Sequence, residues 1–162
     1  MPSLSANFQR MKRYAFALAI GALALLAPVA APAKTRVATF DRSAIVVAYY
    51  RSALWADVLK KKQAELDAAK QAGDTAKVAE LNAWGPEAQE RSGKQLMGAA
   101  PIDNILEALQ PAFRDIEKSQ NVSEVVSGAN VPADADVIDV TGKLLDWLKA
   151  DQKTRDIIRQ LQ

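Results

Sequence analysis

The stretch from Ala44 to Ala72 contains neither glycine nor proline, and no such residue separates it from the short run RVATF at 36–40. It permits a helix of about 29 residues, which at about 1.5 Å per residue would be about 43 Å long. The β-branched, alternating run before it predicts a strand. Because a lone strand leaves backbone groups unpaired, its partner strands must come from elsewhere in this chain or from another copy. Asp41 or Ser43 is expected to cap the helix.

The apolar content of this predicted helix falls along its length. Its first part, AIVVAYY, is apolar almost all round, whereas KKKQAELDAAKQ is mostly polar, with alanines and one leucine. This pattern is typical of a helix that is buried at its base and exposed to solvent towards its tip.

A turn at Gly73 and Asp74 is expected to reverse the chain into a second helix, capped by Asp74 or Thr75. This second helix has only a thin apolar stripe. Gly85 and Pro86 interrupt it, and they predict a kink or a break. Trp84 beside them is either an exposed contact or a residue that fills the kink.

A stronger apolar stripe begins at Ile102 and recurs at three- and four-residue spacing, so it predicts a helix with one buried face, bent at Pro111. Its members are Ile102, Ile105, Leu106, Leu109, Phe113 and Ile116. Two more strands are predicted at 122–128 and 137–141, and the first of them can pair with 36–40. Thr141 is expected to cap a last helix over 142–161, whose inward residues include Leu144, Leu145, Leu148, Ile157, Ile158 and Leu161.

The N-terminal segment has the features of a secretion signal. Lys12 and Arg13 precede an apolar run that ends at Leu26, and Ala31-Pro32-Ala33 matches a signal peptidase site. We expect cleavage after Ala33, which assigns residues 1–33 to a signal peptide and 34–162 to a single domain. An uncleaved anchor is the alternative, although the run is shorter than the roughly 20 residues of a membrane span. The mature chain is expected in the periplasm or secreted, without stable insertion in a membrane.

Composition excludes several functions. The chain has no His and no Cys, so the usual general base, thiol nucleophile and zinc ligands are missing. No phosphate-binding loop, dinucleotide fingerprint or nucleophile elbow occurs. Composition alone leaves a Ser–Lys or double-carboxylate enzyme open, but no spacing suggests one, and we expect no enzyme, cofactor or metal site. Without residues 1–33, 18 of the 21 Lys and Arg remain against 19 Asp and Glu, a formal charge of −1, so no nucleic-acid partner is expected.

Three stretches together resemble the Skp/OmpH-like periplasmic chaperone family. RVATFDRSAIVV is similar to the family's first strand and arm helix, and AAKQAGDTAKVAEL to the tip of its arm. IEKSQNVSEVVSGANVPADADVIDVTGKLLDWL is similar to its later strands and closing helix, so the resemblance covers residues 36–149. It implies an α+β, mainly helical fold in which short strands form a small intersubunit β body. An antiparallel helical hairpin of coiled-coil type, about 44–120, projects from that body.

The resemblance also implies a homotrimer that holds unfolded outer-membrane proteins without ATP. Few aromatic residues and short strands independently favour an oligomer, because a single chain would bury little surface. The residues that the resemblance assigns to the body are Val37, Phe40, Val125, Val126, Ile138 and Val140, with Leu144 and Leu148 packing a helix onto it. Three features depart from the pattern of this family. They are the near-neutral charge of the mature chain, the interruption at Gly85 and Pro86, and the extension 149–162. They keep open an alternative, a non-catalytic structural or assembly protein of the cell envelope.

Four aromatic residues are the candidate client or partner contacts: Tyr49, Tyr50, Trp55 and Trp84. The first three can also simply pack the base of a helix, which is the commoner role of aromatic side chains. A calcium loop over 134–142 is not favoured, since Ile138 stands where a third ligand should be and Asp139 where glycine is required.

Overall fold

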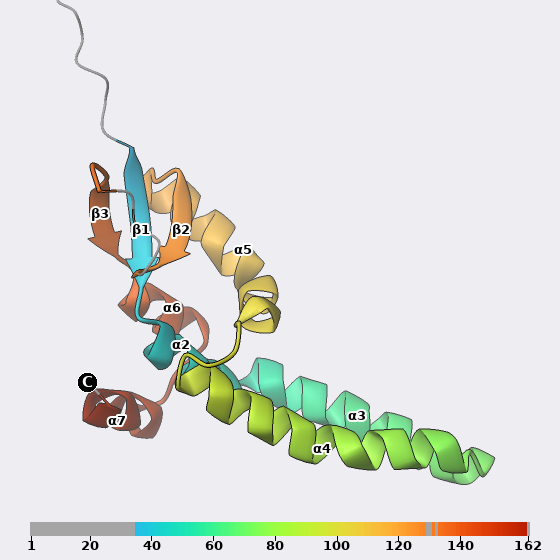
Figure 1. The fold of residues 1–162 in the computed structure, drawn as a ribbon. Coiled ribbons are helices and arrows are strands. Elements are labelled where there is room, and N and C mark those ends of the chain that lie inside the picture. The colour runs from blue at the N-terminus through green and yellow to red at the C-terminus, as the bar shows by residue number, and fades with distance from the viewer. Residues whose placement is uncertain (1–34, 129–130, 132, 162) are drawn as a thin grey trace, which may run out of the picture. The chain divides into compact units, whose positions relative to one another are not determined.

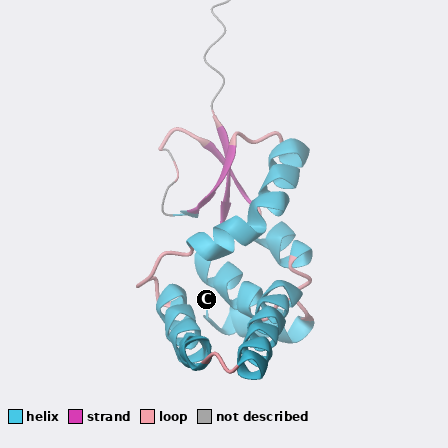
Figure 2. Ribbon diagram, turned by 90° about the vertical axis from the view of Figure 1, so that its right-hand side faces the viewer, coloured by secondary structure: helices cyan, strands magenta, loops and turns pink. Residues whose placement is uncertain are grey.

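The computed structural model describes residues 35–128, 131 and 133–161, which belong to the unit Lys34–Gln162. The predicted signal peptide lies outside the described residues. Helices dominate, and the strands form one small parallel sheet (Figures 1 and 2). In chain order the elements are β1 (Arg36–Phe40), α2 (Arg42–Tyr50), α3 (Ala53–Ala72), α4 (Thr75–Leu96), α5 (Asp103–Gln120), β2 (Glu124–Ser127), β3 (Asp136–Asp139), α6 (Thr141–Trp147) and α7 (Gln152–Leu161).

The sheet has β1 at its centre, in the order β2-β1-β3 (Figure 1). Val37 lies opposite Glu124 on one side and opposite Val137 on the other, and both pairings are parallel. The prediction that 36–40 pairs with the second strand is confirmed. Parallel neighbours need a long crossover, and here α2 to α5 connect β1 to β2. Both partners of β1 therefore come from its own chain.

The core of the unit lies where α2, α5 and α6 meet the sheet. The predicted apolar stripe of α5 is confirmed, and Phe113 stacks on Phe40 with 6.0 Å between ring centroids. Of the residues assigned to the body, Val37, Phe40, Val140, Leu144 and Leu148 are buried, and Val125, Val126 and Ile138 are half-buried. The half-buried ones all lie on β2 and β3, the edge strands, which have a neighbour on one side only in the described sheet.

The prediction of one helix over 44–72 is wrong. The structure ends α2 at Tyr50 and begins α3 at Ala53. Ser52 makes this break, because its Oγ donates to the carbonyl of Tyr49 at 2.7 Å and accepts from the backbone N–H of Trp55 at 3.5 Å. A serine that caps a new helix competes with continuation of the old one.

The caps and the turn predicted for the first helices are confirmed, whereas one predicted interruption is not. Asp41 caps α2 and Asp74 caps α4, each accepting a backbone N–H, and Gly73 ends α3 with φ +68°. Of the kink or break predicted at Gly85 and Pro86, the break is wrong, since α4 runs through Pro86. Pro86 lies on an exposed face, as does Asn82, whose carbonyl loses its helical partner and can be hydrated instead.

The predicted last helix is also wrong as a single element. It is two helices, α6 and α7, and Lys149 in the connection has φ +55°. Thr141 does not cap α6; its Oγ1 accepts from the backbone N–H of Asp41 at 2.8 Å and so ties α6 to the start of α2. On α7, Ile158 is buried as predicted, whereas Leu161 is 54% exposed.

Candidate functional site

The structure brings the four predicted aromatic residues together where α2, α3 and α4 meet. The ring centroids are 5.2 Å apart for Tyr49 and Tyr50, 4.8 Å for Tyr50 and Trp55, and 5.8 Å for Trp55 and Trp84. The two tryptophans stack at 28°, whereas the other two pairs meet edge to face. These are the favourable geometries of aromatic pairs. We call this group the aromatic cluster.

The break between α2 and α3 positions the cluster. Tyr49 and Tyr50 are the last residues of α2, and Trp55 lies in the first turn of α3. Trp84 comes from α4, which lies beside α3 (Figure 1). Trp84 is half-buried and stacks on Trp55, in a helix that is continuous at this point.

Exposure differs across the cluster. Tyr49 is 4% exposed, and its burial, together with the neighbouring Tyr50, raises its pKa above the ordinary value. Tyr50, Trp55 and Trp84 are half-buried. Tyr49 thus has the packing role that was the alternative for these residues, while the other three keep surface that a ligand can reach.

Two hollows flank Trp84 on the α3–α4 pair. One, of about 430 Å³, is lined by Leu59, Lys60, Lys62, Gln63, Leu66, Leu81, Trp84 and Gly85. The other, of about 250 Å³, is lined by Tyr50, Trp55, Leu59, Trp84, Gly85, Ala88, Gln89 and Ser92. Leu59, Trp84 and Gly85 belong to both, so the two hollows are neighbours, and we call them together the tryptophan groove.

Lysines border the wider part of the groove. The Nζ of Lys62 lies 5.9 Å from the centroid of the Trp84 ring, in range of a cation–π contact. Lys62 also pairs with Glu65 at 2.7 Å and Lys60 with Asp57 at 3.5 Å, on their own helix. Leu59, 46% exposed, adds an apolar side chain to the same rim.

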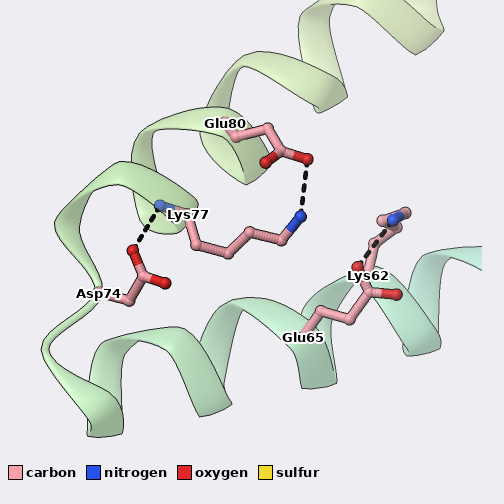
Figure 3. Close-up of polar contacts among 5 residues, drawn as sticks. All are labelled: Lys62, Glu65, Asp74, Lys77 and Glu80. Atoms are coloured by element: carbon pink, nitrogen blue, oxygen red, sulfur yellow. Dashed lines mark hydrogen bonds and ion pairs between the residues drawn. The ribbon is translucent and has the colours of Figure 1, made fainter.

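Towards the tip, the α3–α4 pair carries exposed polar contacts (Figure 3), while Ala69 and Leu81 remain buried. Lys77 pairs with Glu80 at 2.7 Å, which raises the pKa of Lys77. The hydrogen bond from Lys62 lowers the pKa of Glu65, and the charge of Lys77 on the facing helix adds to this shift. Such exposed pairs contribute little to stability, so the tip has few strong constraints.

The base of the α3–α4 pair is fixed by Gln95, a residue that sequence analysis did not single out. Gln95 is 1% exposed; its Oε1 accepts from the hydroxyl of Tyr50 at 2.7 Å. Its Nε2 donates to the carbonyl of Pro101 and to Oδ1 of Asn104, both at 2.7 Å. One amide therefore joins α2, α4 and the start of α5. A lone Gln in a polar helical stretch has no pattern that predicts this burial.

The C-terminal extension also reaches this base. Arg51, in the break between α2 and α3, donates from Nε to Oγ1 of Thr154 on α7 at 3.0 Å. Thr154 is 3% exposed, and hydrogen bonds from its side chain and from its backbone N–H lower the pKa of the Asp151 carboxyl. Residues 149–161 thus brace the junction from which α3 departs.

Amide hydrogen exchange is expected to be slow in β1 and α2 and fast over residues 60–92. The reason is that α2 has five buried residues, whereas α3 and α4 together have Ala69, Leu81, Ala88 and Gln95. Exchange followed by mass spectrometry of peptic fragments measures this gradient. Equal protection along α2, α3 and α4 would contradict it.

Two other kinds of functional feature, a metal site and a membrane-spanning helix, are not indicated in the described part of the chain. Among the described residues, no group of three or more acidic side chains is placed so that it could hold a metal ion. Asp134, Asp136 and Asp139 therefore do not form such a group. Among the described helices, none has both the length and the apolar content needed to cross a membrane. In comparisons with known proteins, no family model, no curated protein and no solved structure matches this chain.

Proposed function

We propose that residues 34–162 form an exported, ATP-independent holdase that binds unfolded outer-membrane or envelope proteins in the periplasm or outside the cell. Its α3–α4 pair would act as a projecting antiparallel hairpin that contacts the client. Its sheet would join those of other copies in a homotrimer.

The observation that carries the proposal is the exposure of the α3–α4 pair. Only four of its side chains are buried in the described chain, although it contains residues 53–96. A helical pair of this length that buries so little of its own surface leaves most of it for contact with another molecule. The half-buried Trp55 and Trp84, with the exposed Leu59, supply apolar surface suited to an unfolded chain.

The sheet supports the oligomeric part of the proposal. β2 and β3 are edge strands of the described sheet, and Val137 on β3 is 45% exposed. Open edges tend to pair with further strands, and three short strands form a small sheet by themselves. Joining the sheets of several chains would cover these edges.

A second function, a structural or assembly protein of the envelope, is favoured by charge. The α3–α4 pair, residues 53–96, carries seven Lys and Arg against seven Asp and Glu. It therefore has no net charge with which to attract clients over a distance. Such a protein would keep the oligomeric body without holding clients.

The test is suppression of aggregation. A urea-unfolded outer-membrane β-barrel protein is diluted into buffer with the mature chain and without ATP, and light scattering is followed. We expect scattering to fall in proportion to the chain added and to be unaffected by ATP, because exposed apolar client segments would be covered. Multi-angle light scattering of the same preparation is expected to give a trimer.

An unrelated helical protein at the same concentration is the control for crowding and non-specific adsorption. If the mature chain assembles but leaves client aggregation unchanged, the holdase proposal is wrong and the structural function takes its place. A stable monomer at micromolar concentration would remove the trimer from the proposal.

A further inference from the structure

The tryptophan groove combines apolar and cationic surface in a way that restricts what it can bind. We propose that it binds an extended segment of an unfolded protein in which aromatic or large aliphatic side chains stand next to carboxylates. This inference rests on the proposed function and deepens it, because it names the class of client segment and the place where it binds.

The apolar part of the groove would take the client's aromatic or aliphatic side chain. Trp84 lies between the two hollows, stacked on Trp55, and Leu59 completes the wall. Because the two rings already contact each other, and Trp55 also contacts Tyr50, they are held in place before a ligand arrives. Ordering them would therefore cost little entropy on binding. The wider hollow, about 430 Å³, is in the size range of sites for small organic groups.

The charges around the groove favour carboxylates next to the apolar side chain of the client segment. Lys60 and Lys62 are among the residues that line the wider hollow, and no carboxylate is among them. The narrower hollow has no charged lining residue at all. Lys61, exposed between the two lining lysines, adds a third positive charge to this turn of α3. The charged side chains that a client carboxylate would meet in this lining are thus both cationic.

The ion pairs that Lys60 and Lys62 already make do not prevent them from binding a client carboxylate. Asp57 and Glu65 accept from Lys60 and Lys62 along α3, and all four side chains are at least 32% exposed. Exposed pairs of this kind are worth about 0–1 kcal/mol, so a client carboxylate can share or replace them. Lys62 also keeps its position over Trp84, which places the charge next to the apolar wall.

The test uses two fluorescein-labelled peptides of equal length and apolar content, in which phenylalanine and valine alternate either with glutamate and serine or with lysine and serine. Binding to the full mature chain is measured by anisotropy at low and at high salt. We expect the acidic peptide to bind at least about tenfold more tightly, and this preference to shrink at high salt, since the lysines are exposed to solvent.

Variants locate the binding. Trp84→Ala should weaken binding of the acidic peptide at least about fivefold, because it removes the shared wall of both hollows. Trp84→Leu should restore part of the loss, and circular dichroism checks that both variants remain helical. Lys62→Glu should reduce or reverse the preference between the peptides. The matched control is Lys70→Glu, a lysine of the same helix that lines a separate hollow near Gly73; it should change the preference less.

Three results would overturn the inference while leaving the holdase intact: equal affinity for both peptides, wild-type binding by Trp84→Ala, or aggregation suppressed with neither peptide bound. The converse result separates the two proposals. If the acidic peptide binds as expected but client aggregation is not suppressed, the groove is a peptide site and the holdase function is wrong.

Discussion

Leu109→Ala is expected to lower the free energy of unfolding by about 2–5 kcal/mol, the usual cost of removing a buried leucine side chain. Leu109 is 0% exposed in α5, at the centre of the core that joins this helix to α2 and the sheet. The substitution loses the transfer free energy of the apolar side chain and leaves a cavity that close-packed neighbours fill only in part. Denaturant unfolding of the mature chain, followed by circular dichroism at one fixed protein concentration, measures the change.

Leu59→Ala is the matched control, since it makes the same substitution on α3 at a side chain that is 46% exposed. It should change stability by about 0.5 kcal/mol or less. Similar losses for both variants would mean that Leu59 is covered in the assembled protein, and that the core described for the single unit is incomplete.

Gln95→Ala is expected to cost about 2–3 kcal/mol, because it removes three hydrogen bonds and leaves their partners poorly satisfied. This one side-chain amide makes three hydrogen bonds of 2.7 Å, with the hydroxyl of Tyr50, the carbonyl of Pro101 and Oδ1 of Asn104. The loss should also loosen the base of the α3–α4 pair, so hydrogen exchange should accelerate in α4 more than in β1. Unfolding and exchange measurements on the same variant check both effects.

Gln89→Ala is the control for helix propensity and the loss of an amide, since Gln89 is exposed on the same helix. It should be neutral or slightly stabilising, because alanine is the best helix former. Gln95→Glu keeps the size of the side chain but presents an acceptor to two acceptors at neutral pH. We expect it to be at least as destabilising as Gln95→Ala. Wild-type stability for both Gln95 variants would show that this amide does not fix the base.

Local signals predicted a large part of the fold. Residues within about four positions of one another decide several features that were predicted correctly. These are the strand at 36–40, the caps Asp41 and Asp74, and the turn at Gly73. The apolar spacing of α5 was equally clear, because its buried face is strong enough to retain a helix through Pro111. The later strands were placed correctly to within a few residues, since β-branched runs between turn residues mark them.

The candidate site was predicted in its members but not in its arrangement. Aromatic residue types alone marked Tyr49, Tyr50, Trp55 and Trp84, yet no spacing rule connects Trp84 to Trp55 across the turn. Their stacking depends on the length of α3 and on α4 continuing past Pro86. The burial of Gln95 was not predictable, since it depends on partners from three separate segments.

Neighbouring residues decide which segments are helical or extended, where most of them begin and end, and which face of α5 is apolar, so these properties were predictable from local patterns. Tertiary structure decided the rest. It set the parallel order β2-β1-β3, the division of the last helix into α6 and α7, and the pairing of Thr141 with the backbone of Asp41. Each of these depends on hydrogen bonds or packing between residues far apart in the chain, such as Arg51 with Thr154. Contacts of this kind can override a local preference worth only about 1 kcal/mol, and no local pattern records them.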